Sequence, residues 1–181
     1  IGWYHHNTAS FGAMESKASQ GLDGYPGFVD PMLHRTLGGM VTADDGQQVR
    51  LSALKGRPVV LYFYPKDDTP GCTAEACAFR DRRQEIADTG AQVLGVSPDP
   101  VASHIRFRDK YQLNFPLLAD PDHAVAEKYG AWREKNNYGQ KTMGIQRSTI
   151  LIDANGKVAK VWQRVRVEGH DQEVLDALRA L

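Results

Sequence analysis

The residues with the clearest chemical potential are the two cysteines, Cys72 and Cys77, which lie five positions apart. The preceding segment, Thr69-Pro70-Gly71, is typical of a helix start, because Thr can serve as an N-cap and Pro suits the first helical position. Cys72 would then lie in the first turn, where unpaired backbone N–H groups and the helix dipole favour a thiolate over a thiol. The pattern therefore predicts a reactive Cys72.

Cys77 would follow on the same helix. Two Cα atoms five residues apart in an ideal α-helix are separated by about 8.7 Å, whereas a disulfide needs less than about 7 Å. The two sulfurs can therefore bond only if the helix unwinds, as in a catalytic or sensing pair. A simpler interpretation stays open, in which both are small buried hydrophobic residues, because free cysteine is often buried.

The same residues argue against several other kinds of site. The spacing is not Cys-x-x-Cys, which disfavours a thioredoxin-type disulfide reductase. Two cysteines are too few for a disulfide-rich scaffold or a four-cysteine zinc site. Asp67-Asp68 is interpreted as a solvated loop rather than a metal site, and His5-His6 as a solvated pair or a tag remnant. The other histidines show no ligand spacing and are interpreted as surface or hydrogen-bonded residues: His34, His104, His123 and His170.

The elements that must position Cys72 follow from the hydrophobic pattern. Residues 58–64 form a continuous β-branched and aromatic run, which predicts a strand buried on both faces. This strand leads directly into the helix predicted over 70–88, and open α/β sheets place their active sites where a strand ends and a helix begins. Further strands are predicted over 91–97, 115–118, 148–153 and 157–162, further helices over 99–111, 120–129 and 169–181, and a small hairpin over 40–51.

These elements predict one α/β domain with three layers and a mixed sheet, because strands and helices alternate before a final hairpin and helix. We expect the helix over 99–111 to turn Val101, Ile105 and Phe107 inward. The domain is placed at 37–181. Residues 1–36 lack a basic leader, an apolar core and periodicity, so we expect an appendage of unassigned role, either an extension or a tag.

Composition excludes other classes of protein. The 181 residues include 22 basic and 22 acidic side chains, and this balance disfavours a nucleic-acid binder or a polybasic membrane binder. No apolar run approaches the roughly 18 residues of a membrane-spanning helix. With 41% hydrophobic and 24% charged residues, the chain has the composition of a globular protein.

At this point the cysteine segment shows a specific resemblance. Pro65-x-x-x-Thr69-x-x-Cys72 resembles the active-site motif of the peroxiredoxins, and the longer run over 64–77 resembles the peroxiredoxin Q subfamily, also called bacterioferritin comigratory protein. The similarity covers about residues 46–181 and departs at the front, over 37–42. It implies a thioredoxin-like fold with a central mixed β-sheet flanked by helices.

The resemblance also implies a role for each matching residue. Cys72 corresponds to the peroxidatic cysteine and Cys77 to the resolving cysteine, which would join it in an intramolecular disulfide. Thr69 would help to hold the peroxide, Pro65 would shield the site from water, and Arg147 would stabilise the thiolate and the charge that moves along the peroxide bond. Glu75 would either orient Arg147 or act only as a charge near the helix N-terminus.

The implied activity is a thiol-dependent peroxidase that reduces hydrogen peroxide and organic hydroperoxides and is recycled by thioredoxin or a similar thiol reductant. Such an antioxidant enzyme would need no cofactor, because cysteine supplies the chemistry. We further expect a monomer in the cytoplasm that binds neither nucleic acid nor membrane. The alternative is a peroxide sensor or thiol redox relay that passes its disulfide to a partner protein.

Overall fold

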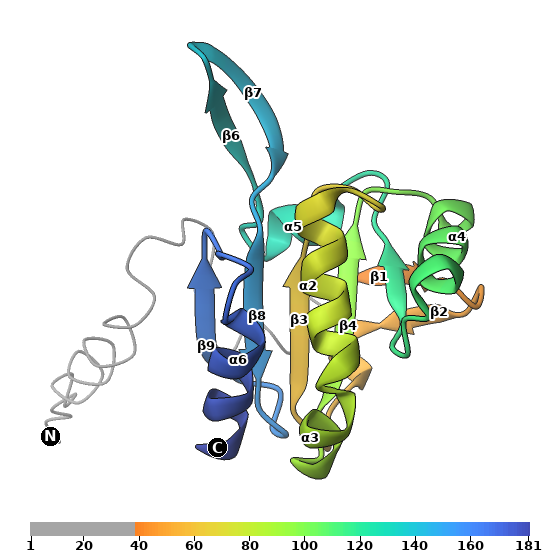
Figure 1. The fold of residues 1–181 in the computed structure, drawn as a ribbon, viewed down its shortest axis with the longest axis vertical. Coiled ribbons are helices and arrows are strands. Elements are labelled where there is room, and N and C mark those ends of the chain that lie inside the picture. Colours follow the sequence, from red (N-terminus) through yellow and green to blue (C-terminus); the bar gives the residue numbers. More distant parts are fainter. Residues whose placement is uncertain (1–38) are drawn as a thin grey trace, which may run out of the picture.

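The computed structural model describes residues 39–181, which form a central sheet of seven strands (Figure 1). The strand order is β2-β1-β5-β4-β3-β8-β9. β3 is parallel to β4 and antiparallel to β8, so the sheet is mixed, as predicted. Its strands are β1 (Met40–Ala43), β2 (Gln48–Arg50), β3 (Val59–Phe63), β4 (Gln92–Ser97), β5 (Leu117–Ala119), β8 (Ser148–Ile152) and β9 (Val158–Gln163).

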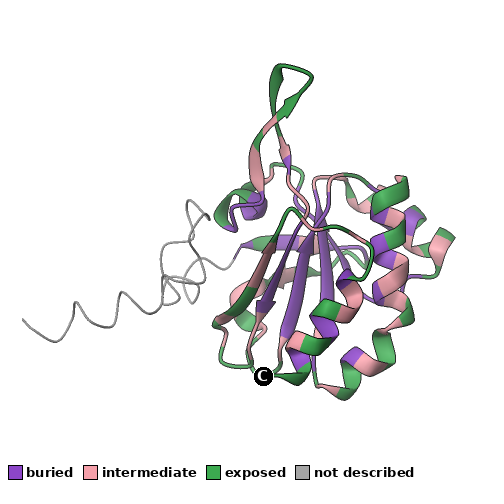
Figure 2. Cartoon of the chain, turned by 60° about the vertical axis from the view of Figure 1, so that its left-hand side comes forward, coloured by how far each residue is buried: buried purple, intermediate pink, exposed green. Residues whose placement is uncertain are grey.

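The central strand β3 is buried along its whole length, which confirms the prediction from residues 58–64. Its side chains alternate between two cores, because successive residues of a strand point to opposite faces. Val60 and Tyr62 belong to one core, while Leu61 and Phe63 belong to the other. In Figure 2 the buried strands form the centre of the molecule, and exposed residues lie on the outer sides of the helices.

Helices cover both faces of the sheet, so the three-layer prediction is confirmed. The first core packs against α2 (Pro70–Asp81), α3 (Arg83–Asp88), α4 (Val101–Tyr111) and α6 (His170–Arg179). The second core packs against α5 (Ala124–Lys128), with a short 3-10 helix, η3 (Leu51–Ala53), at its edge. Figure 1 shows α2, α4 and α6 in front of the sheet and α5 behind it.

The helix predicted over 70–88 is interrupted at Arg82, whose backbone (φ −89°, ψ 2°) leaves the helical region. The Arg82 guanidinium donates to Asp171 on α6 at 2.9 Å and to Glu85 on α3 at 2.9 Å. These bonds connect the junction of α2 and α3 to α6. The prediction of one continuous helix was therefore wrong at its C-terminal end, because nothing in the apolar pattern marks this contact.

The inward face of helix α4 differs from the prediction at one position, while Val101 is partly buried. Phe107 is buried as expected, but Ile105 is 37% exposed and the fully buried neighbour is His104. The inward face therefore includes a histidine that an apolar pattern does not count. Its burial is compensated by a hydrogen bond between Nδ1 and the Asp67 carboxylate at 2.8 Å.

A second, two-stranded sheet was not predicted. β6 (Trp132–Asn137) and β7 (Gln140–Ile145) form an antiparallel hairpin that projects from the body of the molecule (Figure 1). Its turn places Tyr138 (φ 53°) and Gly139 (φ 85°) in the left-handed region, as a two-residue hairpin loop of the I′ type requires. Most residues of the hairpin are polar and exposed, so it carries little hydrophobic periodicity.

The predicted appendage at 1–36 lies outside the described residues, as do His5, His6 and His34. The division of the chain near residue 36 therefore stays a prediction. Within 39–181, no helix has the length and apolar character needed to cross a membrane.

Candidate active site

Cys72 lies in the first turn of α2, as predicted, and is buried with 2% of its surface exposed. The helix begins at Pro70, directly after the loop that follows β3. The Cys72 side chain belongs to the same core as Tyr62 and Phe79. The sulfur is therefore held at the N-terminal end of a 12-residue helix, where the helix dipole favours negative charge.

Thr69 occupies the predicted N-cap position, with extended backbone (φ −96°, ψ 154°) and a carbonyl that accepts from the Thr73 amide at 2.8 Å. The prediction that its hydroxyl caps the helix was wrong. Thr69 Oγ1 instead donates to the Lys66 carbonyl oxygen at 2.9 Å, and no side chain caps α2. The hydroxyl keeps its lone pairs available for an incoming donor, beside the first amides of the helix.

Arg147 contacts the Cys72 sulfur although it lies 75 residues further along the chain. It directly precedes β8, and the pairing of Ser148 with Phe63 brings the start of β8 beside the end of β3. Arg147 Nη2 donates to Cys72 Sγ at 3.3 Å. A Cβ atom at Gly71 would lie 3.2 Å from Arg147 Nη2, so the absence of a side chain at this position gives the guanidinium its room.

Glu75 completes this group and accepts a hydrogen bond from Arg147 Nη1. Of the two alternatives for Glu75, the structure therefore shows the contact with Arg147. Burial raises the pKa of Glu75 to about 7, although the Arg147 guanidinium opposes this shift. Burial also works against the charge of Arg147, but Glu75 and Cys72 beside it raise the pKa of the guanidinium overall.

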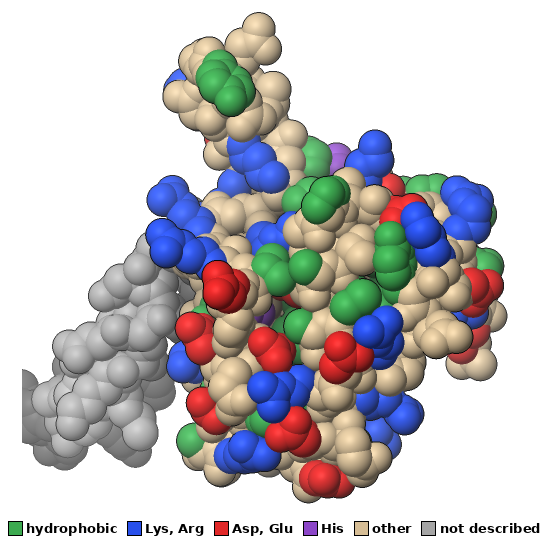
Figure 3. Space-filling model, viewed as in Figure 1, with side chains coloured by type: hydrophobic (Ala, Val, Ile, Leu, Met, Phe, Trp, Pro, Cys, Tyr) green, Lys and Arg blue, Asp and Glu red, His purple; other side chains and the backbone are tan. Residues whose placement is uncertain are grey.

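A further cation lies on the β6–β7 hairpin. The Lys135 stem crosses β7 at Gly144, where a Cβ atom would lie 3.4 Å from two of its carbons. Burial and the nearby Arg147 lower the pKa of Lys135, and the electrostatic influence of Cys72 acts in the opposite direction. On the face that carries α2, Figure 3 shows Lys and Arg side chains near the root of the hairpin. Two cations, Arg147 and Lys135, therefore interact electrostatically with Cys72.

Cys77 lies on the same unbroken helix, is partly exposed, and is a free thiol like Cys72. Five helical steps turn it by about 140° from Cys72, so the two side chains leave the helix on different sides. Pro65 is half-buried in the loop between β3 and α2. The structure thus places the predicted residues on one helix, its preceding loop and the start of β8, while their individual roles stay predictions.

The sequence interpretation missed a buried network behind the active-site loop, which we define as residues 65–69. Asp67 was expected in a solvated loop, but it is 7% exposed. Its carboxylate accepts from Tyr64, Ser103 and His104. Asp68 alone fits the expectation of an exposed side chain. The hydrophobic pattern of the sequence does not distinguish a buried carboxylate that pairs with a histidine from one that faces water.

The remaining histidines of the described region are hydrogen-bonded or stacked, as expected. His170 Nε2 lies 2.7 Å from Thr149 Oγ1, and the His123 ring stacks on Trp132 at 3.8 Å. Within residues 39–181, no group of three or more His, Cys, Asp or Glu side chains could hold a metal ion.

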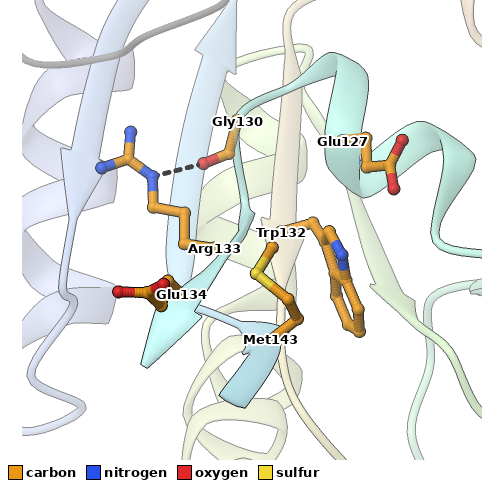
Figure 4. A pocket seen from close by; sticks show the side chains of 6 residues that line it. All are labelled: Glu127, Gly130, Trp132, Arg133, Glu134 and Met143. Atoms are coloured by element: carbon orange, nitrogen blue, oxygen red, sulfur yellow. Dashed lines mark hydrogen bonds between the residues drawn. The ribbon is translucent and has the colours of Figure 1, made fainter. Parts of the chain in front are cut away.

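One pocket of the described region lies apart from the residues that contact Cys72. Figure 4 shows it beside α5, at the root of the β6–β7 hairpin, where Arg133 Nε donates to the Gly130 carbonyl at 2.7 Å. None of the predicted site residues lines it. Its lining residues are Glu127, Gly130, Trp132, Arg133, Glu134 and Met143.

Comparison with known proteins agrees with this geometry. The AhpC/TSA family matches residues 36–161. Peroxiredoxin Bcp of Bacillus subtilis is 48% identical over 136 residues, which cover 75% of this chain and 87% of that protein. Peroxiredoxin Bcp of Escherichia coli K12 is 44% identical over 135 residues, covering 75% and 86%.

Solved structures show the same relationship. Peroxiredoxin Q of Xanthomonas campestris superposes with a TM-score of 0.76 at 43% identity, over 78% of this chain and 90% of that one. Peroxidoxin BcpB of Mycobacterium tuberculosis gives a TM-score of 0.70 at 36% identity, over 79% and 92%. Motif, fold and overall similarity lead to one conclusion: the chain belongs to the AhpC/TSA family and, within it, to the peroxiredoxins of the Bcp or peroxiredoxin Q type.

Proposed function

We propose that the chain is a thiol-dependent peroxidase that reduces hydrogen peroxide and organic hydroperoxides through Cys72. The observation that carries the proposal is the contact of Arg147 Nη2 with Cys72 Sγ, 3.3 Å apart in a buried site at a helix start. Alkyl peroxide reduction is the activity described for the bacterioferritin comigratory protein of Xanthomonas campestris, which supports the same substrate class here.

In the first step the Cys72 thiolate attacks one oxygen of the peroxide, so that an S–O bond forms and the O–O bond breaks. The leaving oxygen takes both electrons of that bond and a proton, giving water or an alcohol, and Cys72 becomes a sulfenic acid. Arg147 stabilises the negative charge as it moves from sulfur to oxygen. Thr69 Oγ1 donates to Lys66, so its lone pairs can accept the O–H of the bound peroxide. Pro65, half-buried in the same loop, limits access of water.

In the second step the Cys77 thiol attacks the Cys72 sulfenic acid, the S–S bond forms, and water leaves. This step requires α2 to open, because both cysteines lie on one continuous helix. A dithiol reductant such as thioredoxin then attacks the disulfide. Exchange returns two thiols to this chain and leaves the reductant oxidised.

The proposal extends to the state of the protein in the cell. We infer that it works as a monomer, because the two cysteines of the proposed disulfide lie on one helix of one chain, so the cycle needs no residue from a second copy. A reducing compartment such as the cytoplasm suits a cycle that must be recycled by a thiol reductant. Neither a nucleic acid nor a membrane has a place in this cycle.

The test is a peroxidase assay coupled to thioredoxin and its reductase, on the wild type, Cys72→Ser and Cys77→Ser. We expect Cys72→Ser to abolish peroxide consumption, and activity near the wild-type level would refute the proposal. A sensor or relay would instead oxidise rapidly and turn over little in this assay.

Intact mass spectrometry distinguishes the two products that the sulfenic acid can give, a disulfide or a stable oxygen adduct. One equivalent of peroxide should lower the mass of the wild type by about two hydrogens, as the disulfide forms. Cys77→Ser should instead gain one or more oxygen atoms. A stable oxygen adduct on the wild type would contradict the resolving role of Cys77.

A further inference from the structure

The active-site loop is fastened to α4 through the buried carboxylate of Asp67. Asp67 Oδ1 accepts from the Tyr64 hydroxyl at 2.7 Å, and Oδ2 accepts from Ser103 Oγ and His104 Nδ1, both at 2.8 Å. Burial raises the pKa of Tyr64 well above its ordinary value, so this hydroxyl stays protonated and can donate. The loop is therefore held by hydrogen bonds to a carboxylate that is largely buried, where such bonds are stronger than in water.

The backbone of the loop is held at the same place. The Asp67 amide donates to Asp99 Oδ2 at 2.7 Å, and Ser97 Oγ donates to the same oxygen at 2.9 Å. The next residue, Asp68, bonds Lys110 Nζ at 2.7 Å and the Tyr111 hydroxyl at 2.6 Å on the exposed side of α4. We call the contacts of Asp67 and Asp68 the loop anchor. Its buried part carries most of the attachment, because exposed ion pairs contribute little.

The far end of α2 is attached to the same helix. Arg80 Nη1 donates to the Tyr111 carbonyl oxygen at 2.6 Å, and Asn114 Nδ2 donates to the Arg80 carbonyl oxygen at 3.2 Å. We call these contacts the helix anchor. The segment between the two anchors, residues 69–79, contains both cysteines and nearly the first three turns of α2. Figure 1 shows α4 on the same side of the sheet as α2.

We propose that the loop anchor and the helix anchor set the limits of the segment that unwinds when Cys72 and Cys77 join, and that His104 is a positioning residue that holds Asp67 throughout the cycle. This proposal depends on the proposed function in one respect: that function includes the step in which Cys72 and Cys77 form a disulfide and α2 unwinds. The helical hydrogen bonds that separate the two sulfurs all lie between the anchors. Opening them leaves the Asp67 contacts intact, so Pro65 need not be repositioned when α2 winds again.

His104 makes a sharp prediction because only one of its ring nitrogens has a partner. Nδ1 must carry the proton, since a carboxylate only accepts, whereas Nε2 is buried without a partner among the described residues. The Asn amide nitrogen occupies nearly the position of Nδ1, so His104→Asn should keep the bond to Asp67. Gln fills more of the space but reaches toward the position of Nε2. A role in filling volume would therefore favour Gln, and a role in positioning Asp67 favours Asn.

The first test is hydrogen exchange on the full chain, reduced and with the disulfide formed by diamide, which takes up the two thiol hydrogens. The Asp67 amide should keep its protection within about threefold, while the amides of 73–77 lose about a hundredfold or more as the helix opens. Equal loss at Asp67 and in the helix would overturn the proposal. So would failure of diamide to join the two sulfurs. Neither result depends on peroxide turnover, so the proposed function is tested separately.

The second test is the rate of Cys72 oxidation by hydrogen peroxide, which requires only the reduced protein. His104→Asn should stay within about threefold of the wild type, while His104→Gln should lose about tenfold, because displacement of the loop misplaces Thr69. Leu178→Ala, in the same core but distant from the loop, serves as a control for lost stability and should leave the rate unchanged. Equal rates for the two His104 variants would overturn the positioning role.

Discussion

Replacing Arg147 by Met would test the electrostatic basis of the site with little change in side-chain volume. The substitution removes the donor 3.3 Å from Cys72 Sγ and the cation beside the buried Glu75. A bare Coulomb estimate at 3.3 Å with an effective dielectric of 20 gives about 5 kcal/mol, but hydrogen bonds to charged groups contribute only about 1.5–3 kcal/mol net. Oxidation of Cys72 by peroxide should therefore slow by about 10- to 150-fold.

The same variant has a second effect, on stability, through Glu75. Burial raises the pKa of this carboxyl group to about 7 even with Arg147 present. Removal of the Arg147 guanidinium therefore raises the pKa of Glu75 further. A carboxyl group with a higher pKa in the folded than in the unfolded protein binds more protons when folded, so stability falls as pH rises. In the wild type this fall levels off above pH 7. In Arg147→Met it continues, at about 1.4 kcal/mol per pH unit.

Urea unfolding between about pH 6 and pH 9 measures the difference in stability between the two proteins. Stopped-flow fluorescence measures the rate of Cys72 oxidation. The gap in unfolding free energy between the wild type and Arg147→Met should widen as pH rises. The double variant Arg147→Met/Glu75→Gln has no titratable group at position 75, so its own unfolding free energy should lack the fall with pH that Glu75 causes. A gap of constant size for the single variant would refute the assignment of Glu75 as a buried group held ionised by Arg147.

Three smaller changes test neighbouring contacts. Thr69→Val removes the hydroxyl that would accept from the peroxide and should slow Cys72 oxidation by about tenfold or more, whereas Thr69→Ser should stay close to the wild type in the same stopped-flow measurement. Gly71→Ala places a methyl group 3.2 Å from Arg147 Nη2 and should slow oxidation several-fold without a comparable fall in Tm; an unchanged rate would show that the guanidinium has room to shift. Tyr64→Phe leaves Asp67 Oδ1 buried without its donor and should cost about 1–3 kcal/mol in urea unfolding, and a loss below about 0.5 kcal/mol would contradict the buried network.

Hydrophobic pattern was sufficient for the elements whose buried face is apolar. The strand β3 and helix α6, with Val174 and Leu175 fully buried, were predicted close to their observed bounds. The pattern failed where burial is polar. His104 is fully buried because Asp67 pairs with it, and neither residue signals this in an apolar count. It failed again for the β6–β7 hairpin, which has little buried surface to leave a pattern.

The site was predictable in two unequal parts. The position of Cys72 follows from local chemistry, because Thr-Pro-Gly marks a helix start wherever it follows a buried strand. Arg147 could not be found in this way, since a lone arginine before a strand is ordinarily a surface charge. Its contact with Cys72 spans 75 residues and depends on the antiparallel pairing of β8 with β3, which only the folded sheet defines.

The hydrogen bond from Thr69 to Lys66 bears both on the reactivity of Cys72 and on the opening of α2. An N-cap hydroxyl stabilises a helix by about 1 kcal/mol, yet Thr69 donates its hydroxyl to Lys66 and leaves the first turn of α2 without a side-chain cap. The uncapped amides strengthen the positive end of the helix beside Cys72, which favours the thiolate. The same missing cap makes the first turn easier to unwind. In the proposed cycle the first step needs a positive helix start and the second needs one that unwinds easily. A side-chain cap at Thr69 would therefore stabilise the fold and oppose the reaction.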